Sequence, residues 1–309
     1  GQTIDAGNLT DYAVYINNAR YVILENIKVK GGKKSGIYIG SYAENIRIIN
    51  CDISGWGRTG TLTEIEEGTV AYVDEDGNKI NYDSGIVLNN CKKVTIERCY
   101  IHEPRGTTNA WADTINNLSW KYSHPMGMCG IYVKATETVI RYNDIIGNEK
   151  HRFNDGIESN GNFKINGGLA ADSDVYGNML AFGQDDGIEL DGGARNVRFF
   201  KNRITNFYSG ISTSANMVGP SYVFNNLVHN LRDSTDTPNL HMKNGGIASG
   251  QGITHIFYNT FFAESGRRDY GIANVNESYN AISRNNIVVG GQASRYQVVV
   301  GATSYENVS

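Results

Sequence analysis

The chain has 309 residues, of which 40% are hydrophobic and 19% are charged, and its formal net charge is −4. A net negative charge argues against nucleic acid as a partner, because a nucleic-acid-binding surface needs clustered Lys and Arg. No stretch approaches the roughly 18 consecutive apolar residues of a membrane-spanning helix. The sequence carries no signal peptide at Gly1, so we expect a processed or trimmed start.

A three-residue motif, x-Gly-Ile, recurs along the chain and opens a short strand-like segment each time. Its copies are centred on Gly36, Gly85, Gly130, Gly156, Gly187, Gly210, Gly246 and Gly271. A second strand-like segment ends in Asn or Cys at a fixed place in each repeat. This position is held by Asn26, Cys51, Cys99, Asn143, Asn178, Asn202, Asn226, Asn259 and Asn286. The repeat therefore predicts about nine stacked rungs, the first carried by residues 13–29.

The apolar residues alternate with others, as in Val197-Arg198-Phe199, and a period of two is typical of β-strands with one buried face. A short coil cannot bury its own apolar face, so neighbouring coils must stack. We predict an all-β chain, a right-handed parallel β-helix forming a single domain over 1–309. The repeated Asn is expected to take the left-handed conformation of a tight bend and to bond the next rung through its amide.

The longer insertions all fall between the Asn or Cys position and the next motif. In chain order they cover 54–83, 102–128, 147–154 and 229–244, with a shorter one at 263–269. The opposite connection is short except at 160–172. Insertions that share one corner would build a wall beside the motif strands, and loops on a rigid repeat often carry binding sites. A cleft along the motif strands is therefore expected.

The four cysteines are Cys51, Cys91, Cys99 and Cys129. Cys51 and Cys99 hold the repeated corner position in consecutive rungs, which lie roughly 4.8 Å apart. This spacing is within disulfide range, but stacked side chains point the same way and rarely reach the required torsion. We expect free, buried thiols and keep a Cys51–Cys99 bridge as the alternative.

In each motif strand the Ile points inward, so the next residue points outward. Down the stack this outward column reads Tyr38, Val87, Tyr132, Glu158, Glu189, Ser212, Ala248 and Ala273. Like charges in adjacent rungs raise each other's pKa and are a poor choice for stability alone. Glu158 and Glu189 therefore indicate a catalytic or metal-binding cluster. Asp155, Asp185 and Asp186 sit at the start of the same strands, where a single Asp-Gly would be ordinary turn chemistry.

Two segments resemble polygalacturonases, glycoside hydrolase family 28. Gln184-Asp185-Asp186-Gly187-Ile188 is similar to the family's Q-D-D-C-hydrophobic motif, and Asn154-Asp155-Gly156 is similar to its N-T-D motif one coil earlier. The resemblance implies a right-handed β-helix that cleaves an acidic polysaccharide with inversion, using Asp155, Asp185 and Asp186. The chain more broadly resembles the carbohydrate-active β-helix proteins of the pectate-lyase-like superfamily.

The chain departs from the polygalacturonase pattern at two places. Tyr208-Ser209-Gly210 stands where the family has Gly-His-Gly, and the family's R-I-K has only a partial counterpart in His241-Met242-Lys243. These differences leave the reaction open.

Three functions fit the sequence. In a glycosidase, Asp186 or Glu189 would be the general acid and Asp155, Glu158 or Asp185 the base, with no cofactor. In a polysaccharide lyase the acids would hold Ca²⁺, and the base would be Lys134, Lys243, His151 or Tyr132. A non-catalytic glycan-binding or surface protein is the third.

A polysaccharide or oligosaccharide is the expected ligand in each case, at a secreted, cell-surface or periplasmic location. The side chains expected to contact it surround the acids on the motif strands and the insertions. They are Tyr132, Lys134, His151, Arg152, Asp191, His241 and Lys243.

Overall fold

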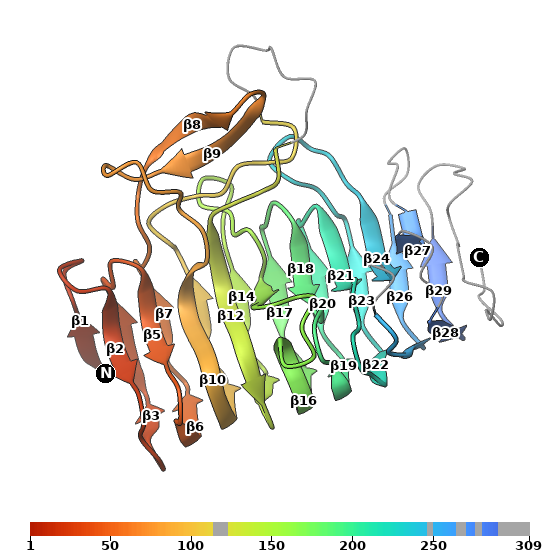
Figure 1. The fold of residues 1–309 in the computed structure, drawn as a ribbon, viewed down its shortest axis with the longest axis horizontal. Helices are drawn as coiled ribbons and strands as arrows, with labels where there is room; N and C mark the ends of the chain where they lie inside the picture. Colours follow the sequence, from red (N-terminus) through yellow and green to blue (C-terminus); the bar gives the residue numbers. More distant parts are fainter. Residues whose placement is uncertain (114–122, 246–249, 264–269, 276–279, 290–309) are drawn as a thin grey trace.

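The computed structural model describes residues 1–113, 123–245, 250–263, 270–275 and 280–289 (Figure 1). Within these ranges the regular structure consists of strands, and no helix is long and apolar enough to cross a membrane. The strands stack along one long axis, with the N-terminal rungs at one end and β29 toward the other (Figure 1).

One side of each coil belongs to a ten-stranded parallel sheet. Its strands, in spatial order, are β1 (Gln2–Asp5), β4 (Ile27–Lys30), β7 (Asp52–Ser54), β11 (Tyr100–His102), β14 (Asp144–Ile146), β17 (Met179–Ala181), β20 (Arg203–Thr205), β23 (Leu227–His229), β26 (Thr260–Phe262) and β29 (Ile287–Val289). Spatial order follows chain order, as expected when each coil stacks on the one before it.

The x-Gly-Ile strands form a second parallel face, which we call the motif sheet. It contains β2 (Tyr12–Ile16), β5 (Ser35–Ile39), the first part of β10 (Asp83–Glu97), β12 (Met128–Thr136), β15 (Ile157–Ser159), β18 (Asp186–Glu189), β21 (Ser209–Thr213), β24 (Leu240–Gly245) and β27 (Tyr270–Val275).

The third face completes each coil. It contains β3 (Ile23–Glu25), β6 (Glu44–Ile49), the end of β10, β13 (Val139–Arg141), β16 (Gly168–Tyr176), β19 (Arg195–Phe200), β22 (Ser221–Phe224), β25 (Thr254–Phe257) and β28 (Ala281–Arg284). The described strands thus make nine three-sided coils, as predicted, preceded by the extra strand β1.

The core is a set of aligned apolar side chains between the three faces. The motif Ile side chains that the structure describes are at most 1% exposed, and Met242 continues their column between Ile211 and Ile272. Fully burying such a side chain stabilises the fold by about 1.5–3 kcal/mol. Burial of the repeated Ile therefore contributes much of the free energy that stabilises the stacking of one rung on the next.

The motif glycine is required by close approach between rungs. A Cβ at Gly156 would lie 2.5 Å from the carbonyl oxygen of Gly187, and a Cβ at Gly36 would lie 2.7 Å from that of Gly85. Backbone oxygens cannot move aside, so a side chain at this position would push the rungs apart.

The predicted alignment of the eighth rung was wrong. Ile211 pairs with Met242, and Ser212 pairs with Lys243, so the motif position belongs to His241-Met242-Lys243 rather than to Gly246. Ile247 and Ala248 lie outside the described residues. The error arose because His replaces the motif glycine here, while Gly245-Gly246-Ile247 nearby imitates the motif.

The predicted Asn ladder is confirmed. The Asn143 Nδ2 atom donates to Asn178 Oδ1 at 2.9 Å, and the same bond links Asn178 to Asn202, Asn202 to Asn226, Asn226 to Asn259 and Asn259 to Asn286. Each ladder amide also donates to a backbone carbonyl, for example Asn178 to Ile140 at 3.0 Å. Buried polar groups that are fully bonded in this way cost little and fix the register.

Two details of the ladder differ from the prediction. The left-handed conformation belongs to the preceding residue, such as Tyr142, Gly177 or Lys201, rather than to the ladder Asn. Asn26 lies one residue outside the ladder: the pairing of Lys28 with Asp52 aligns it with Asn50, whose amide donates to Asn26 at 2.6 Å.

The insertions emerge at one corner, between the ten-stranded sheet and the motif sheet (Figure 1). The first contains an antiparallel hairpin of β8 (Thr61–Glu66) and β9 (Thr69–Val73), which stands above the N-terminal half of the stack. Residues 114–122 and 264–269 of the predicted insertions lie outside the described residues. All four cysteines are buried and free, as predicted.

Candidate active site

Six carboxyl groups gather on the motif sheet and its edge, and we call them the acid cluster: Asp155, Glu158, Asp185, Asp186, Glu189 and Asp191. Five of them are at most 5% exposed, and Glu189 is half-buried. Strand pairing places Tyr132 beside Glu158, Ile157 beside Ile188, and Glu189 beside Ser212. The outward column was therefore predicted correctly from Tyr38 to Ser212.

Asp155 and Asp186 occupy the x position of consecutive motifs, so the repeat itself stacks them. The Asp186 amide donates to Asp155 Oδ1 at 2.6 Å. Asp155, Asp185 and Asp186 each offer an oxygen within 4.8 Å of the others. Burial is the main cause that raises the pKa of Asp155 well above its ordinary value, and Glu189, Asp185 and Asp186 add to it.

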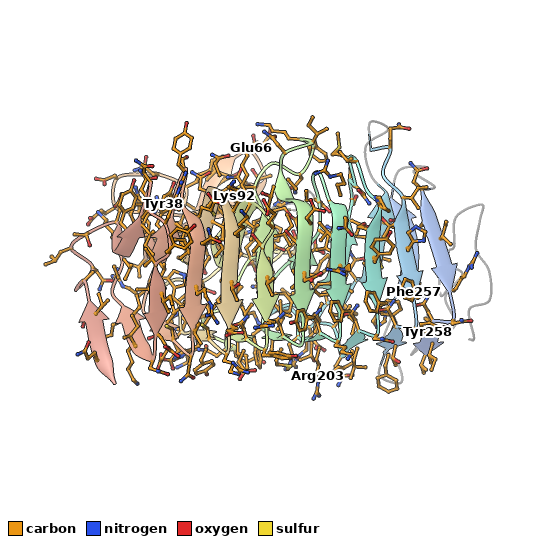
Figure 2. All side chains as sticks on the ribbon, turned by 90° about the horizontal axis from the view of Figure 1, so that it is seen from below. Tyr38, Glu66, Lys92, Arg203, Phe257 and Tyr258 are labelled. Atoms are coloured by element: carbon orange, nitrogen blue, oxygen red, sulfur yellow. The ribbon has the colours of Figure 1, made fainter. Side chains whose placement is uncertain are left out.

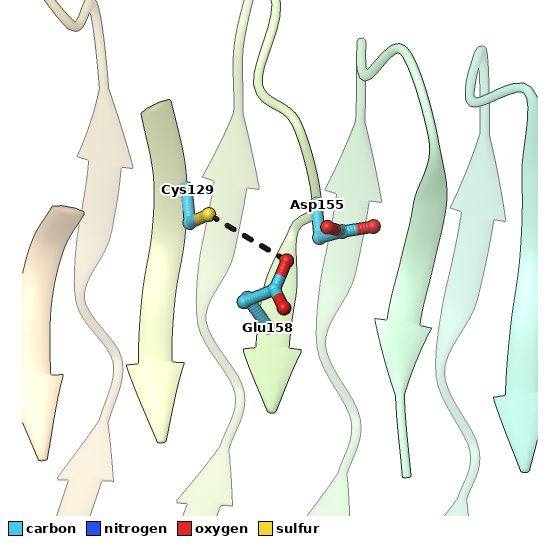
Figure 3. Close-up of side chains that lie close together, drawn as sticks. All are labelled: Cys129, Asp155 and Glu158. Atoms are coloured by element: carbon cyan, nitrogen blue, oxygen red, sulfur yellow. Dashed lines mark hydrogen bonds between the residues drawn. The ribbon is translucent and has the colours of Figure 1, made fainter. Parts of the chain in front are cut away.

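Glu158 lies at the centre of the acid cluster. Its Oε2 accepts a hydrogen bond from Asn154 Nδ2 at 3.3 Å and lies 4.0 Å from the Cys129 thiol (Figure 3). Burial raises the pKa of Glu158 well above its ordinary value, and the charges of Glu189 and Asp155 raise it further. The buried carboxyl group of Glu158 therefore holds its proton to a higher pH than an ordinary glutamate does.

Glu189 differs from Glu158 in exposure and in bonding. Its Oε2 accepts a hydrogen bond from Asn162 Nδ2 at 3.0 Å. Burial and the charge of Asp186 raise the pKa of Glu189, while Lys243 and hydrogen bonds from Glu158 and Asn162 favour its ionised form. The pKa of both stacked glutamates is raised, and that of the more buried Glu158 is raised further, which makes Glu158 the better candidate for a general acid.

Lys243 lies at the acid cluster and not on the wall of insertions. It belongs to β24, in the outward column next to Ser212, and its Nζ lies 2.5 Å from Asp186 Oδ2. Burial opposes its charge, but Asp186, Asp185 and Glu189 outweigh burial and raise the pKa of Lys243 well above its ordinary value. Burial raises the pKa of Asp186 to about 6, against the opposing effect of Lys243.

Asp185 connects the acid cluster to the second insertion. Its Oδ1 accepts a hydrogen bond from Trp111 Nε1 at 3.2 Å, and His124 Nε2 lies 3.9 Å from its Oδ2. Trp111 also packs near Tyr208, with ring centroids 6.0 Å apart. Burial raises the pKa of Asp185, whereas Lys243 and His124 act in the opposite direction.

The sequence-based site did not include Trp111, His124, Asn154, Asn162 or Tyr82. Each of them contacts the cluster or stacks on a residue of the outward column. For two of these residues the sequence offered an indication, because Trp111 and His124 both fall in the insertion 102–128, which was predicted to form part of the wall of the cleft.

Tyr132 and Asp191 lie beside the acid cluster as expected. The Tyr132 ring stacks on Tyr82 with centroids 4.7 Å apart and an interplanar angle of 7°. Asp191 is buried, and its Oδ1 accepts hydrogen bonds from the Ser212 hydroxyl at 3.0 Å and the Ser214 amide at 2.6 Å. Asp191 therefore supports the backbone of the next coil.

Four other residues expected at the ligand lie elsewhere. Arg152 is 1% exposed, and its guanidinium donates to the carbonyls of Gly183, Asn206 and Arg232. His151 Nδ1 lies 3.0 Å from the Gly106 carbonyl oxygen. His241 is fully buried against Phe261, because it holds the motif glycine position. Lys134 lines a separate cavity of about 420 Å³.

Among the residues that the structure describes, two groups of side chains could hold a metal ion. Asp155, Asp185 and Asp186 supply three carboxylates, a donor set that suits Ca²⁺. Cys129, Asp155 and Glu158 form the second group, with a thiol among its donors (Figure 3). The ammonium group of Lys243 already forms an ion pair with Asp186. A metal ion bound by Asp155, Asp185 and Asp186 would therefore compete with Lys243 for the Asp186 carboxylate.

A cavity of about 580 Å³ opens on the motif sheet beside the acid cluster. It runs over the N-terminal rungs from Asp11 and Tyr38 to Tyr132. The cavity lies on the face where the cleft was predicted, but Glu158 and Glu189 are not part of its lining, and the insertion residues in that lining come from 54–83.

Comparison with known structures agrees with the architecture. An alginate lyase from Paenibacillus sp. str. FPU-7 is similar with a TM-score of 0.55 and 11% identity over 88% of this chain and 84% of the lyase chain. A tailspike protein double mutant of E. coli bacteriophage HK620, in complex with a pentasaccharide, is similar with a TM-score of 0.55 and 13% identity. That match covers 91% of this chain but 44% of the tailspike chain. At these identities the likeness concerns the fold.

No curated protein matches the sequence. The family model described as right-handed beta helix region matches residues 3–227, which is most of the chain. The chain therefore belongs to the family of right-handed β-helix proteins.

Proposed function

We propose that the chain is a glycoside hydrolase that cleaves a polysaccharide at the acid cluster. The observation that carries the proposal is the stacked pair of the buried Glu158, whose pKa is raised well above its ordinary value, and the more exposed Glu189. Glycoside hydrolysis needs one protonated and one ionised carboxyl group on either side of the scissile bond. In this proposal Glu158 provides the protonated group and Glu189 the ionised one, from adjacent strands.

Glu158 is the general acid in this proposal. Its carboxyl proton passes to the glycosidic oxygen as the bond to the anomeric carbon breaks. Glu189 takes a proton from water, or attacks the anomeric carbon itself. These roles exchange those expected from the sequence, where Glu189 was a candidate acid and Glu158 a candidate base, because burial beside Cys129 favours the proton on Glu158.

Lys243 and Asp186 are positioning residues in this proposal. Asp186 is fully buried, so it does not contact the substrate and acts on it only through neighbouring side chains. The ammonium of Lys243 offsets part of the negative charge and favours the ionised forms of Glu189 and Asp185.

A polysaccharide lyase with bound Ca²⁺ is the second candidate. The three carboxylates of Asp155, Asp185 and Asp186 favour it, and one structural relative is an alginate lyase. A lyase also needs a base. Lys243 and Tyr132 fit that role poorly, because the pKa of each is raised and both groups hold their protons near neutral pH.

Products and metal dependence separate the two reactions. A hydrolase adds one water to each cleaved bond and retains its activity in EDTA. A lyase adds no water, yields an unsaturated product that absorbs ultraviolet light, and loses activity in EDTA if Ca²⁺ is required. A panel of polysaccharides with product mass spectrometry tests this directly. Failure to cleave any of them, with binding retained, would favour a glycan-binding protein at a cell surface or outside the cell.

A further inference from the structure

The cavity beside the acid cluster has a floor and walls rich in tyrosine. Tyr12, Tyr38, Tyr82 and Tyr132 all line it. Tyr132 is also the strand neighbour of Glu158, so the lining of the cavity ends one rung from the acid cluster. Pairing of Tyr38 with Val87 and of Val87 with Tyr132 places Tyr38 three rungs from Glu158, or roughly 14 Å at about 4.8 Å per rung.

The tyrosine rings form two preorganised groups. Tyr12 and Tyr38 have centroids 4.5 Å apart, and Tyr15 lies 5.4 Å from Tyr38. The Tyr38 hydroxyl accepts a hydrogen bond from Asn89 Nδ2 at 2.7 Å, which fixes its ring near the N-terminal end of the stack (Figure 2). Tyr82 stacks on Tyr132 and is 42% exposed. Such rings present apolar faces and hydroxyl groups at little entropic cost.

The charged groups of the cavity largely neutralise one another. Arg58 donates to Asp83 at 2.8 Å and to Asp74 at 3.0 Å, and Lys34 donates to Asp11 at 2.9 Å. Lys33 and Asp76 are the remaining charged residues of the lining. The cavity thus has no excess of positive charge, and the neighbouring acid cluster is negative. A polyanionic chain would be repelled along this path.

We propose that this cavity is a glycan-binding extension of the acid cluster that takes uncharged sugar units on its tyrosine rings, so that the substrate is a neutral polysaccharide cleaved within the chain. The proposal rests on the glycosidase function proposed above, and it departs from the acidic substrate implied by the polygalacturonase-like motifs. The stacked tyrosines provide apolar faces for sugar rings, and the hydroxyl groups provide hydrogen bonds to sugar oxygens.

Binding can be measured separately from cleavage in the Glu158→Gln variant. Calorimetric titration of this variant, made as the whole 309-residue chain, would use neutral xylo-, manno-, galacto- and gluco-oligosaccharides, with galacturonate and alginate oligosaccharides of the same lengths. Tyr82→Ala and Tyr12→Ala are added to this background. Tyr100→Ala is the matched control, because Tyr100 is 44% exposed but lies on β11 outside the cavity.

We expect at least one neutral series to bind more tightly as its length increases, and the uronate series to bind weakly. Tyr82→Ala and Tyr12→Ala should each weaken binding of the longer neutral oligosaccharides by roughly threefold to tenfold, as loss of an aromatic contact does. Tyr100→Ala should leave binding unchanged. Circular dichroism of every variant excludes unfolding as the cause.

Several outcomes would overturn the inference. They are preferred binding of uronates, binding to none of the series, and binding that Tyr82→Ala and Tyr12→Ala leave unchanged. If the wild type cleaves a neutral glycan while the tyrosine variants bind normally, the inference fails and the glycosidase function stands. If neutral oligosaccharides bind through the tyrosines but no glycan is cleaved, the binding site is supported and the hydrolase function fails.

Discussion

Lys243 and Asp186 form an ion pair across the motif sheet, with Nζ 2.5 Å from Oδ2. The two residues belong to β24 and β18, which lie on either side of β21. The residue of β21 beside Lys243 is Ser212, whose small side chain leaves room for the lysine to reach across. A single ammonium thus compensates for a group of carboxylates.

Replacing Lys243 with Met should raise the pKa of Asp186, Asp185 and Glu189, because Lys243 lowers all three. The acidic limb of the pH–activity profile should move to higher pH. Removing one partner of a buried pair should also cost about 3 kcal/mol of stability at neutral pH. Activity measured across pH, together with urea unfolding, checks both effects. An unmoved acidic limb would show that Lys243 does not control the catalytic carboxylates.

Glu158→Gln and Glu189→Gln should each reduce turnover by about 10²- to 10⁴-fold, because each removes a group that transfers or accepts a proton. Both variants should fold normally, since they relieve repulsion between stacked carboxyl groups. Glu66→Gln is the matched control, because Glu66 lies on β8 of the hairpin, outside the acid cluster. Turnover on the cleaved polysaccharide is the measurement, and near-normal rates in both variants would remove the pair from the chemistry.

Asp186→Asn should lower turnover indirectly, since Asp186 holds Lys243 in place. Its effect should therefore include a displaced pH profile as well as a lower rate. A rate loss of similar size with an unchanged profile would instead assign the proton transfer to Asp186 itself.

Stability should fall as pH rises from about 4 toward neutrality. The pKa of Asp155, Glu158 and Asp191 is raised well above the ordinary value, with burial as the first cause. Over this window the folded state keeps protons that the unfolded chain releases, so increasing pH favours unfolding. Thermal unfolding across pH should show this decline, and Glu158→Gln should reduce its slope. A rise in Tm over the same range would contradict the pKa directions.

Asn178→Ala should destabilise the stack by roughly 3 kcal/mol, because it leaves several buried groups without partners. Asn178 accepts two hydrogen bonds from Asn143 and donates to Ile140 and Asn202. Arg203→Ala, at an exposed position of β20 (Figure 2), provides the comparison. Equal unfolding midpoints for the two variants would mean that the ladder contributes little.

The fold was predictable because its determinants are local and periodic. The motif Ile, the close-packed glycine and the ladder Asn repeat along the chain, so each copy supports the others. The same reasoning failed where the repeat lost its glycine. His241 holds that position in β24, and the nearby Gly246 led to the wrong alignment.

The site was predictable only where it lies on the repeat. Glu158 and Glu189 follow from the outward column, but Lys243 required the correct register of β24. Trp111 and His124 contact Asp185 from a loop. The conformation of a loop does not follow from the sequence repeat, so these contacts could not be predicted. Arg152 was expected at the ligand because it is a charged residue in an insertion. The structure instead buries it against the carbonyl groups of Gly183 and Asn206, a contact that the sequence does not reveal.

Product analysis of one cleaved neutral polysaccharide tests the central claim most directly. Wild-type protein in EDTA should release oligosaccharides whose mass includes one added water, without ultraviolet absorbance, and Glu158→Gln should release on the order of 10²-fold less. Unsaturated products, formed only with Ca²⁺ present and at the same rate in Glu158→Gln, would contradict it.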